Sequence, residues 1–515
     1  MISEHENRVK YKIPLAILGL IGTSIIFLLT SRHGAGISPD SVAYISVARH
    51  IASGAGFITY DEYYFVLQPP LYPILLAAIK ELLLIDPLTS AGYVNAILFG
   101  LIVYFSGLFF LKKLNSFTLV VMGTVSVLIS YALVQVSLMA WSEPLFILLT
   151  LLYLYYFETY QAKGDITSLI LLSASAALAC LTRYIGVIII LTGVVNILLQ
   201  RKNILKEKLR HIIIFLLITV LPVGVWIIRN YSLSGTLIGQ RAVSSYTLSE
   251  NMKFLLNTVL PWYLPGGITG QYVIFWILTA VAVISVGIGL MKRWNKKVLN
   301  LKQISPTLIF VLFYVGIIVI SSTTTAYDHI DNRLLSPIYV PATFILFFGS
   351  DKILTWLQKY FSPKLITVLF AAAIVMLMTF PVRNTIYIVN DYIEQSGWEY
   401  NSKPWRDSET IQYLIKHRSL ETGFTFYSNA PEAVYILANI ETMWSPAKTM
   451  YNSPQLLSAN SKLNSNWQGG GKVCLVWFNK INRDFLFTIN ELQKNTKMAE
   501  VAHFQDGEIY TFTEK

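Results

Sequence analysis

Long apolar runs separated by short polar segments dominate the first three quarters of the chain. Helical runs of about 17–22 residues match the hydrocarbon thickness of a bilayer. The pattern predicts a polytopic α-helical membrane protein with about eleven transmembrane helices. The predicted spans are residues 13–31, 92–111, 117–138, 143–160, 166–181, 184–200, 211–229, 272–291, 305–322, 334–350 and 364–381.

The connections between these spans carry an uneven distribution of basic residues. If the N-terminus is cytoplasmic, most Lys and Arg of the connecting segments fall on the cytoplasmic side, as the positive-inside rule requires. This predicts a multi-pass membrane protein with a cytoplasmic N-terminus. Its two long outer loops are residues 32–91 and 230–271.

The stretch from Pro70 to Ile85 tests this topology, because it is apolar enough to resemble a span. It contains Lys80 and Glu81 and is too short to cross a bilayer comfortably. A span here would also reverse every later loop. We therefore expect a helix that lies on the outer membrane surface.

The chain changes character after the last span. Residues 1–381 form the predicted membrane domain, and residues 382–515 alternate short strands and helices, which predicts a small extracytoplasmic α/β domain. The predicted strands are Gly423–Tyr427, Thr442–Trp444, Val473–Phe478, Met498–His503 and Glu508–Phe512. The predicted helices are Asp407–His417, Pro431–Ala438, Pro454–Leu463 and Arg483–Lys494.

The composition excludes several classes of protein. The 515 residues are 54% hydrophobic and only 13% charged, and the net charge of +11 is spread between the apolar runs, which argues against nucleic-acid binding. The two cysteines, Cys180 and Cys474, predict neither a metal cluster nor a disulfide. No Walker loop or dinucleotide fingerprint is present. An outward-facing enzyme would therefore take its activated group from a carrier in the membrane, such as a lipid phosphate.

Asp40 is the first candidate for chemistry, because it lies directly after the first span. Ser38 and Pro39 predict a helix start, so Asp40 could simply face the positive end of the helix dipole. A carboxylate held on a rigid surface helix could also act as a general base. These two interpretations are compatible.

Arg183 and Arg333 lie at span ends on the same side as Asp40. Each could extend to the interface, or offer a fixed fork to a phosphate. Two arginines on the face that holds Asp40 favour an anion site. Glu143, at the start of a span on this side, is interpreted as a partner of the helix dipole. Weaker basic candidates are Arg49, Arg229 and Arg241.

Asp61 and Glu62 lie in an aromatic-rich turn of the first outer loop. A second carboxylate near Asp40 could position an acceptor or help bind a cation. An ordinary solvated loop is the interpretation that we favour.

Several of these stretches resemble the GT-C glycosyltransferases, in particular the branch of the protein O-mannosyltransferases and the aminoarabinose lipid A transferases. The matching features are the Pro39-Asp40-Ser41 opening of the first outer loop with Tyr44 four residues after the Asp, and the plan of many spans followed by an exoplasmic tail. Three short motifs add to the resemblance: Gln68-Pro69-Pro70-Leu71-Tyr72-Pro73, Thr182-Arg183-Tyr184, and Asp331-Asn332-Arg333-Leu334-Leu335-Ser336-Pro337. The similarity covers residues 10–380 and, more loosely, the tail.

The resemblance implies an inverting transferase that uses a polyprenyl-phosphate sugar and a glycan, lipid or protein acceptor. Asp40 matches the family's catalytic Asp, and Arg183 and Arg333 match positions where basic residues meet the lipid phosphate. Gln68 departs from the family, which often carries an acidic, Lys or His residue there. Tyr44 and Gln68, with Asp61 and Glu62, are candidates for an acceptor or secondary site. No metal ligands are assigned, and dependence on a divalent cation stays open.

A transporter or a lipid or glycan flippase is the alternative function. Such a protein is expected to have paired, broken spans and ionisable residues at mid-membrane. The charges of this chain instead lie at span ends, which favours the enzyme.

Overall fold

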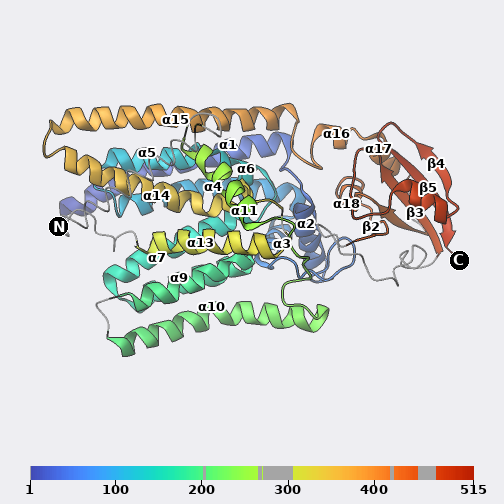
Figure 1. Cartoon of the computed structure of the whole chain (residues 1–515), viewed down its shortest axis with the longest axis horizontal. Helices are drawn as coiled ribbons and strands as arrows, with labels where there is room; N and C mark the ends of the chain where they lie inside the picture. Colours follow the sequence, from blue (N-terminus) through green and yellow to red (C-terminus); the bar gives the residue numbers. More distant parts are fainter. Residues whose placement is uncertain are drawn as a thin grey trace.

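The computed structural model describes residues 2–200, 204–264, 270, 305–326, 328–417, 423–449 and 471–514. A bundle of long helices and a small β-sheet lie end to end (Figure 1). Two short helices, α2 (Pro39–Ala52) and α3 (Leu71–Leu83), lie at the end of the bundle that faces the sheet. The N-terminus lies at the opposite end of the bundle.

The helices of the bundle follow the predicted apolar runs. Every predicted span within the described residues coincides with a helix or with a pair of consecutive helices; the predicted span 272–291 lies outside them. The helices are α1 (Ile2–His33), α4 (Pro87–Leu111), α5 (Phe117–Leu128), α6 (Tyr131–Leu138), α7 (Glu143–Lys163), α8 (Ile166–Thr182), η1 (Tyr184–Gly186), α9 (Val187–Leu198), α10 (Leu205–Ser234), α13 (Ser305–Thr324), α14 (Asn332–Leu357) and α15 (Pro363–Glu394).

Six of the described helices are long and apolar enough to cross a membrane, or seven if the bent pair α5 and α6 counts as one span. Helices α8 and α9 are apolar but shorter. The protein is thus a helical membrane protein, whereas the count of eleven spans stays a prediction. The predicted span 117–138 contains a 43° bend, and Ser130 caps the second helix by accepting a hydrogen bond from the Leu133 N–H.

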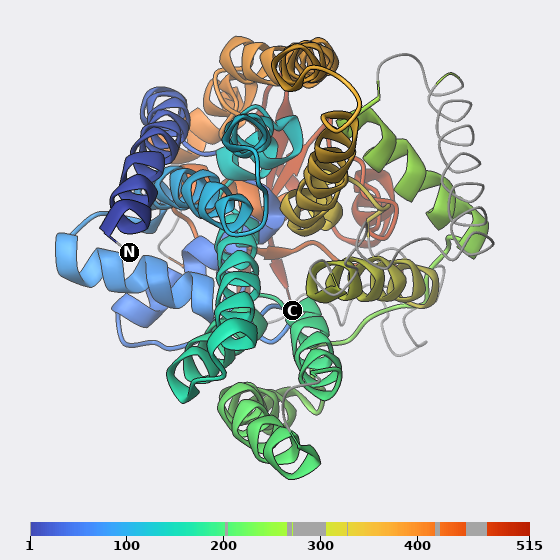
Figure 2. The same cartoon turned by 90° about the vertical axis from the view of Figure 1, so that its left-hand side faces the viewer.

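The bundle has a closely packed centre and apolar outer helices. Helices α4 and α14 are largely buried inside it, whereas α10 and α15 expose apolar side chains along opposite edges (Figures 1 and 2). Close packing of α1 on α4 depends on glycine: a Cβ at Gly100 would approach the carbonyl oxygen of Gly19 to 2.6 Å.

The stretch from Pro70 to Ile85 forms α3, a helix of 13 residues that does not reach the length of a span. Its last turn is strongly exposed, with Leu82 at 80% and Leu84 at 89%. Exposed leucines beside a membrane bundle suit the predicted interfacial position.

The C-terminal segment forms a five-stranded sheet in the order β2-β1-β3-β5-β4. Strands β1, β2 and β3 are parallel, and β4 and β5 are antiparallel additions. Each predicted strand is present. The strands are β1 (Phe424–Ser428), β2 (Met443–Trp444), β3 (Gly471–Phe478), β4 (Ala499–His503) and β5 (Gly507–Glu514), with helices α16 (Lys403–Arg406), α17 (Glu409–Lys416), α18 (Pro431–Ala438) and α19 (Ile489–Asn495).

The C-terminal segment differs from the sequence prediction at the start of one helix and where the bundle ends. The helix predicted over Arg483–Lys494 begins only at Ile489, where Thr488 and Glu491 form a capping box. Helix α15 continues across the predicted domain boundary at residue 382 to Glu394, so the start of a separate domain stays a prediction. The predicted helix Pro454–Leu463 lies outside the described residues.

The outer loop predicted over residues 230–271 contains α11 (Leu248–Val259) and η2 (Leu260–Trp262) in its described part. Residues 265–269 and 271 lie outside the described residues.

The segment between α15 and α16 is hydrogen-bonded to the loop that follows α1. The backbone N–H of Tyr400 donates to the carbonyl of Ile37, and the Ile37 N–H donates to the carbonyl of Trp398. Further along, the rings of Tyr60 and Tyr435 lie 5.4 Å apart. The segment before Asp40 is therefore held by both the bundle and the C-terminal part of the chain.

Candidate active site

Asp40 stands in the first turn of α2, and the capping of this helix is carried out by its neighbours. The Ser38 side chain accepts from the Ser41 N–H, and the Ser41 hydroxyl accepts from the Ser38 N–H, which completes a capping box. Trp141 donates its indole N–H to the Ser38 oxygen at 2.7 Å. The Asp40 carboxylate accepts instead from the side chains of Arg333 and Gln68. The capping interpretation therefore explains Ser38 and leaves Asp40 available.

Arg333, near the start of α14, connects two carboxylates. Its Nη2 donates to Asp40 Oδ2, and its Nε donates to Glu143 Oε1 at 2.7 Å. The guanidinium also lies over the Trp141 ring, 4.3 Å from the ring centre. Asp331 caps α14 by accepting from the Leu334 N–H, which fixes the start of the helix and with it the direction of Arg333.

Arg183 directly follows α8 and contacts the same oxygen, since its Nη1 pairs with Glu143 Oε1. Two guanidinium groups thus share one carboxylate oxygen. The Glu143 side chain is fully buried, whereas Arg183, Arg333 and Asp40 are 16%, 18% and 34% exposed. We call buried Glu143 the floor of the site and Asp40, its most exposed member, the mouth.

The four charges balance, with two carboxylates and two guanidinium groups. Burial would raise the pKa of Asp40, but the charge and hydrogen bond of Arg333, assisted by Arg183 and Gln68, hold that pKa below its usual value. Asp40 is therefore ionised at neutral pH. Two buried polar atoms, Glu143 Oε2 and Arg183 Nε, have no hydrogen-bond partner among the described residues.

Glu143 has a larger role than its place in the sequence indicates. A role as dipole partner alone is wrong, because a fully buried Glu143 is the shared counter-ion of Arg183 and Arg333. The available signal was the pair of arginines itself. Two guanidinium groups at one rim require nearby negative charge, and Asp40 supplies only one.

Gln68 and Tyr44 also belong to the surroundings of Asp40. Gln68 Nε2 donates to Asp40 Oδ1 at 2.9 Å. Tyr44 is buried one turn after Asp40, with its hydroxyl 3.1 Å from Ser142 Oγ and its ring against Tyr72. Burial, together with the charges of Asp40 and Glu143, raises the pKa of Tyr44, so its hydroxyl stays neutral.

The weaker basic candidates make contacts that stabilise the first outer loop. Arg49 pairs with Asp86, while Arg229 donates to the carbonyls of Phe57 and Phe65. Arg241 donates to the carbonyl of Leu67, next to Gln68.

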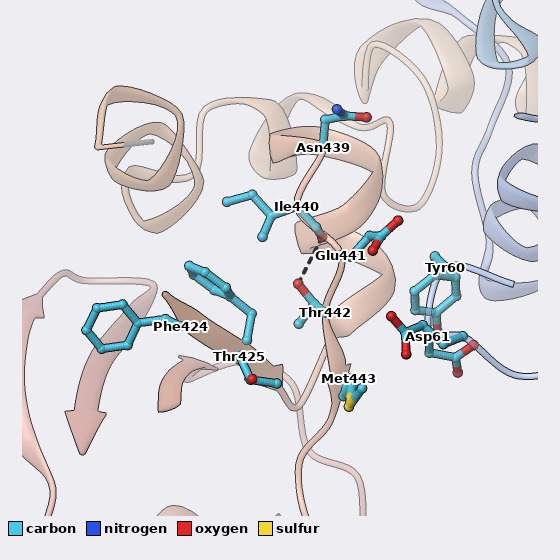
Figure 3. A pocket seen from close by; sticks show the side chains of 11 residues that line it. Tyr60, Asp61, Phe424, Thr425, Asn439, Ile440, Glu441, Thr442 and Met443 are labelled. Carbon is cyan, nitrogen blue, oxygen red and sulfur yellow. Dashed lines mark hydrogen bonds between the residues drawn. The ribbon is translucent and has the colours of Figure 1, made fainter. Parts of the chain in front are cut away.

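Asp61 and Glu62 line a separate pocket of about 460 Å³ (Figure 3). Its other walls come from β1, β2 and the segment between α18 and β2, including Phe424, Glu441 and Thr442. Burial raises the pKa of Asp61, although hydrogen bonds from Thr59 and the backbone oppose this shift. The lining of this pocket does not include Asp40 or its arginine partners, so Asp61 and Glu62 belong to the junction with the sheet.

Within the described ranges, no group of three or more His, Cys, Asp or Glu side chains is arranged to hold an ion.

Comparison with known proteins identifies the fold. No family model matches the chain, and no curated protein matches its sequence. The structure is similar to that of ArnT from Cupriavidus metallidurans in the apo state, with a TM-score of 0.63 and 12% identity over 96% of this chain and 97% of that chain. The same ArnT bound to undecaprenyl phosphate gives a TM-score of 0.55 at the same identity and coverage.

A second similar structure is the archaeal oligosaccharyltransferase AglB from Archaeoglobus fulgidus, in complex with an inhibitory peptide and a dolichol-phosphate. Its TM-score is 0.53, with 10% identity over 90% of this chain and 69% of that chain. ArnT and AglB are GT-C enzymes, so the chain has the GT-C fold and the predicted resemblance is confirmed at that level.

Proposed function

We propose that this protein is an integral-membrane glycosyltransferase that moves a sugar from a polyprenyl-phosphate donor to an acceptor hydroxyl at the outer membrane surface. The main support is the meeting of Asp40, Arg183 and Arg333 at one end of the bundle, although Arg333 lies 293 positions from Asp40 in the chain. The fold is consistent with this, since ArnT and AglB, which share it, have been seen with undecaprenyl phosphate and a dolichol-phosphate.

In the proposed reaction Asp40 acts as the general base. It takes the proton of the acceptor hydroxyl while the acceptor oxygen attacks the anomeric carbon of the sugar. The bond between that carbon and the phosphate oxygen breaks, and the lipid phosphate leaves with the electron pair. A single displacement of this kind inverts the anomeric configuration.

Arg183 and Arg333 would hold the phosphate and stabilise the negative charge that grows on the leaving oxygen. Their fixed contact with buried Glu143 supports this role, because a preorganised guanidinium does not need to reorient during the reaction.

The acceptor, a glycan, lipid or protein, is proposed to approach from the side of the sheet, where Asp61 and Glu62 line their pocket. This assignment assumes the proposed topology. In that topology the protein lies in a bacterial inner membrane, with a cytoplasmic N-terminus and an extracytoplasmic C-terminal domain.

The test is a comparison of cell-envelope glycans and lipids by mass spectrometry in cells that contain the wild-type protein, no protein, or Asp40→Asn. We expect the product to be lost in the last two, with Asp40→Asn present in the membrane at normal amounts. Glu81→Gln, an exposed acid of the same outer loop, is the matched control and should retain the product.

Full product formation by Asp40→Asn would refute Asp40 as the base. Identical glycans and lipids with and without the protein would refute the transferase and leave the transporter or flippase as the better hypothesis, to be examined by lipid translocation in vesicles.

A further inference from the structure

The ion pair between Asp40 and Arg333 raises a question about the proposed reaction. A general base is most useful when its carboxylate is free to accept a proton, yet the partner that lowers its pKa is the arginine proposed to bind the donor phosphate. Asp40 and the phosphate would thus compete for one guanidinium, which also contacts Glu143.

We propose that the donor phosphate displaces Asp40 from Arg333, so that donor binding itself releases the base. This inference rests on the proposed function and adds an order to it: the lipid-linked donor binds first, and only then can Asp40 accept a proton from the acceptor.

The geometry of Arg333 supports an exchange at one of its two contacts. The contact of its Nε with Glu143 is made on a fully buried carboxylate and is expected to persist. The contact of its Nη2 with Asp40 lies at the mouth of the site, on a carboxylate that is 34% exposed. An anion that arrives from the membrane surface meets this second contact first.

The charges of the site point the same way. Asp40, Glu143, Arg183 and Arg333 sum to zero, so the free site offers no net attraction for an anion while all its pairs are closed. Opening the Asp40 contact gives a phosphate access to Nη2 of Arg333. Arg183 Nε, buried and without a partner among the described residues, is a second donor group in the same cluster.

Gln68 explains how the released carboxylate stays in place. Its Nε2 holds Asp40 Oδ1, the oxygen that Arg333 does not use. Because the amide is neutral, it positions the carboxylate and lowers the pKa of Asp40 less than the full charge of a Lys would. The departure from the family pattern at this position therefore fits a base that is freed by its ligand.

A double-mutant cycle tests the exchange. Affinity for undecaprenyl phosphate is measured at pH 7.5 in nanodiscs of constant lipid composition for the wild type, Asp40→Asn, Arg333→Gln and the double variant. If Asp40 competes for Arg333, Asp40→Asn should bind about fivefold more tightly than the wild type, the size of one partly exposed ion pair. In the Arg333→Gln background, the same substitution should give little gain.

Simple charge repulsion between Asp40 and the phosphate predicts the opposite pattern. Without Arg333 to screen it, repulsion would make the gain from Asp40→Asn equal or larger in the Arg333→Gln background, and this result would overturn the inference. Arg333→Lys provides a second background, because one ammonium keeps the charge but loses the fork that contacts both carboxylates. The gain should shrink there too, and an undiminished gain would also count against the exchange.

The outcomes separate this inference from the proposed function. In one outcome the wild type binds undecaprenyl phosphate and forms product, while Asp40→Asn gives equal gains in affinity in both backgrounds. This result would refute the exchange and leave the proposed function intact. A wild type that does not bind the lipid phosphate overturns the donor assignment and the exchange with it.

Discussion

Two groups of carboxylates lie at the end of the bundle that faces the sheet, and they differ in their partners. Asp40 and Glu143 are paired with guanidinium groups from two other helices. Asp61, Glu62 and Glu441 line an open pocket in which none of the described lining residues is basic (Figure 3).

The difference appears in the pKa values of one member of each group. The Arg333 charge holds the pKa of Asp40 below its usual value in spite of burial, whereas burial raises the pKa of Asp61. A closed, balanced set of charges is suited to a reaction in which charge moves. An open pocket lined by acids, with no basic side chain among its described lining residues, is suited to binding polar or cationic groups. We therefore assign the proposed chemistry to the site around Asp40 and the proposed acceptor contact to the pocket at Asp61.

The largest effect on stability is expected from Glu143→Gln, because it leaves the buried guanidinium groups of Arg183 and Arg333 without their shared carboxylate. Removing one partner from a buried ion pair costs about 3–5 kcal/mol in the free energy of unfolding. We expect a large fall in the apparent melting temperature of the purified protein and loss of product. Unfolding in detergent, followed by tryptophan fluorescence, measures the first effect.

Glu441→Gln is the control in the open pocket. Its carboxylate is 62% exposed, and a surface substitution of this kind changes stability by only about 0.5 kcal/mol. Equal destabilisation by the two variants would contradict the distinction between a buried carboxylate shared by two arginines and an exposed carboxylate whose ion-pair partner is His50.

The parts of the site that the sequence predicts are those with a local signature. Asp40 follows a helix-start pattern at the end of an apolar run, and Arg183 and Arg333 interrupt or flank apolar runs on the same side of the membrane. Apolar periodicity also predicts the bundle helices and alternation predicts the strands, because both depend on neighbouring residues.

The remaining features depend on contacts between distant segments. Glu143 looks like an ordinary first-turn acid until the fold brings Arg333, 190 positions away, against it. The pocket at Asp61 has walls from strands that lie hundreds of residues further along the chain. No local pattern predicts such contacts, since loop paths and packing decide them.

The second prediction compares two identical substitutions, Asp40→Asn and Asp61→Asn. At neutral pH, Asp40→Asn should lower the free energy of unfolding by about 1 kcal/mol, because a partly exposed ion pair with Arg333 is lost. Asp61→Asn should leave stability unchanged or raise it slightly, since it removes an ionised carboxylate whose burial is unfavourable.

The pH dependence of the two effects should differ in sign and range. The pKa of Asp40 is lowered in the fold, so its stabilising contribution is present above the pKa of the unfolded chain and is lost only as pH falls through the lower folded value. The pKa of Asp61 is raised, so its unfavourable contribution disappears as pH falls from the folded value toward the unfolded one. The Asp61→Asn difference should thus vanish first on acidification. Melting curves across pH would contradict this if both variants behaved alike.

The smallest effect should come from the pocket itself, in the double variant of Asp61→Asn and Glu441→Gln. If the pocket only contacts the acceptor, the loss of two charges should raise KM for the acceptor about threefold, about 0.7 kcal/mol of binding, and leave kcat close to that of the wild type. Asp40→Asn should instead abolish kcat, because it removes the base. Steady-state rates at varied acceptor concentration measure both quantities. A fall in kcat for the pocket variant with KM unchanged would place these acids in the chemistry and remove the division between the two regions.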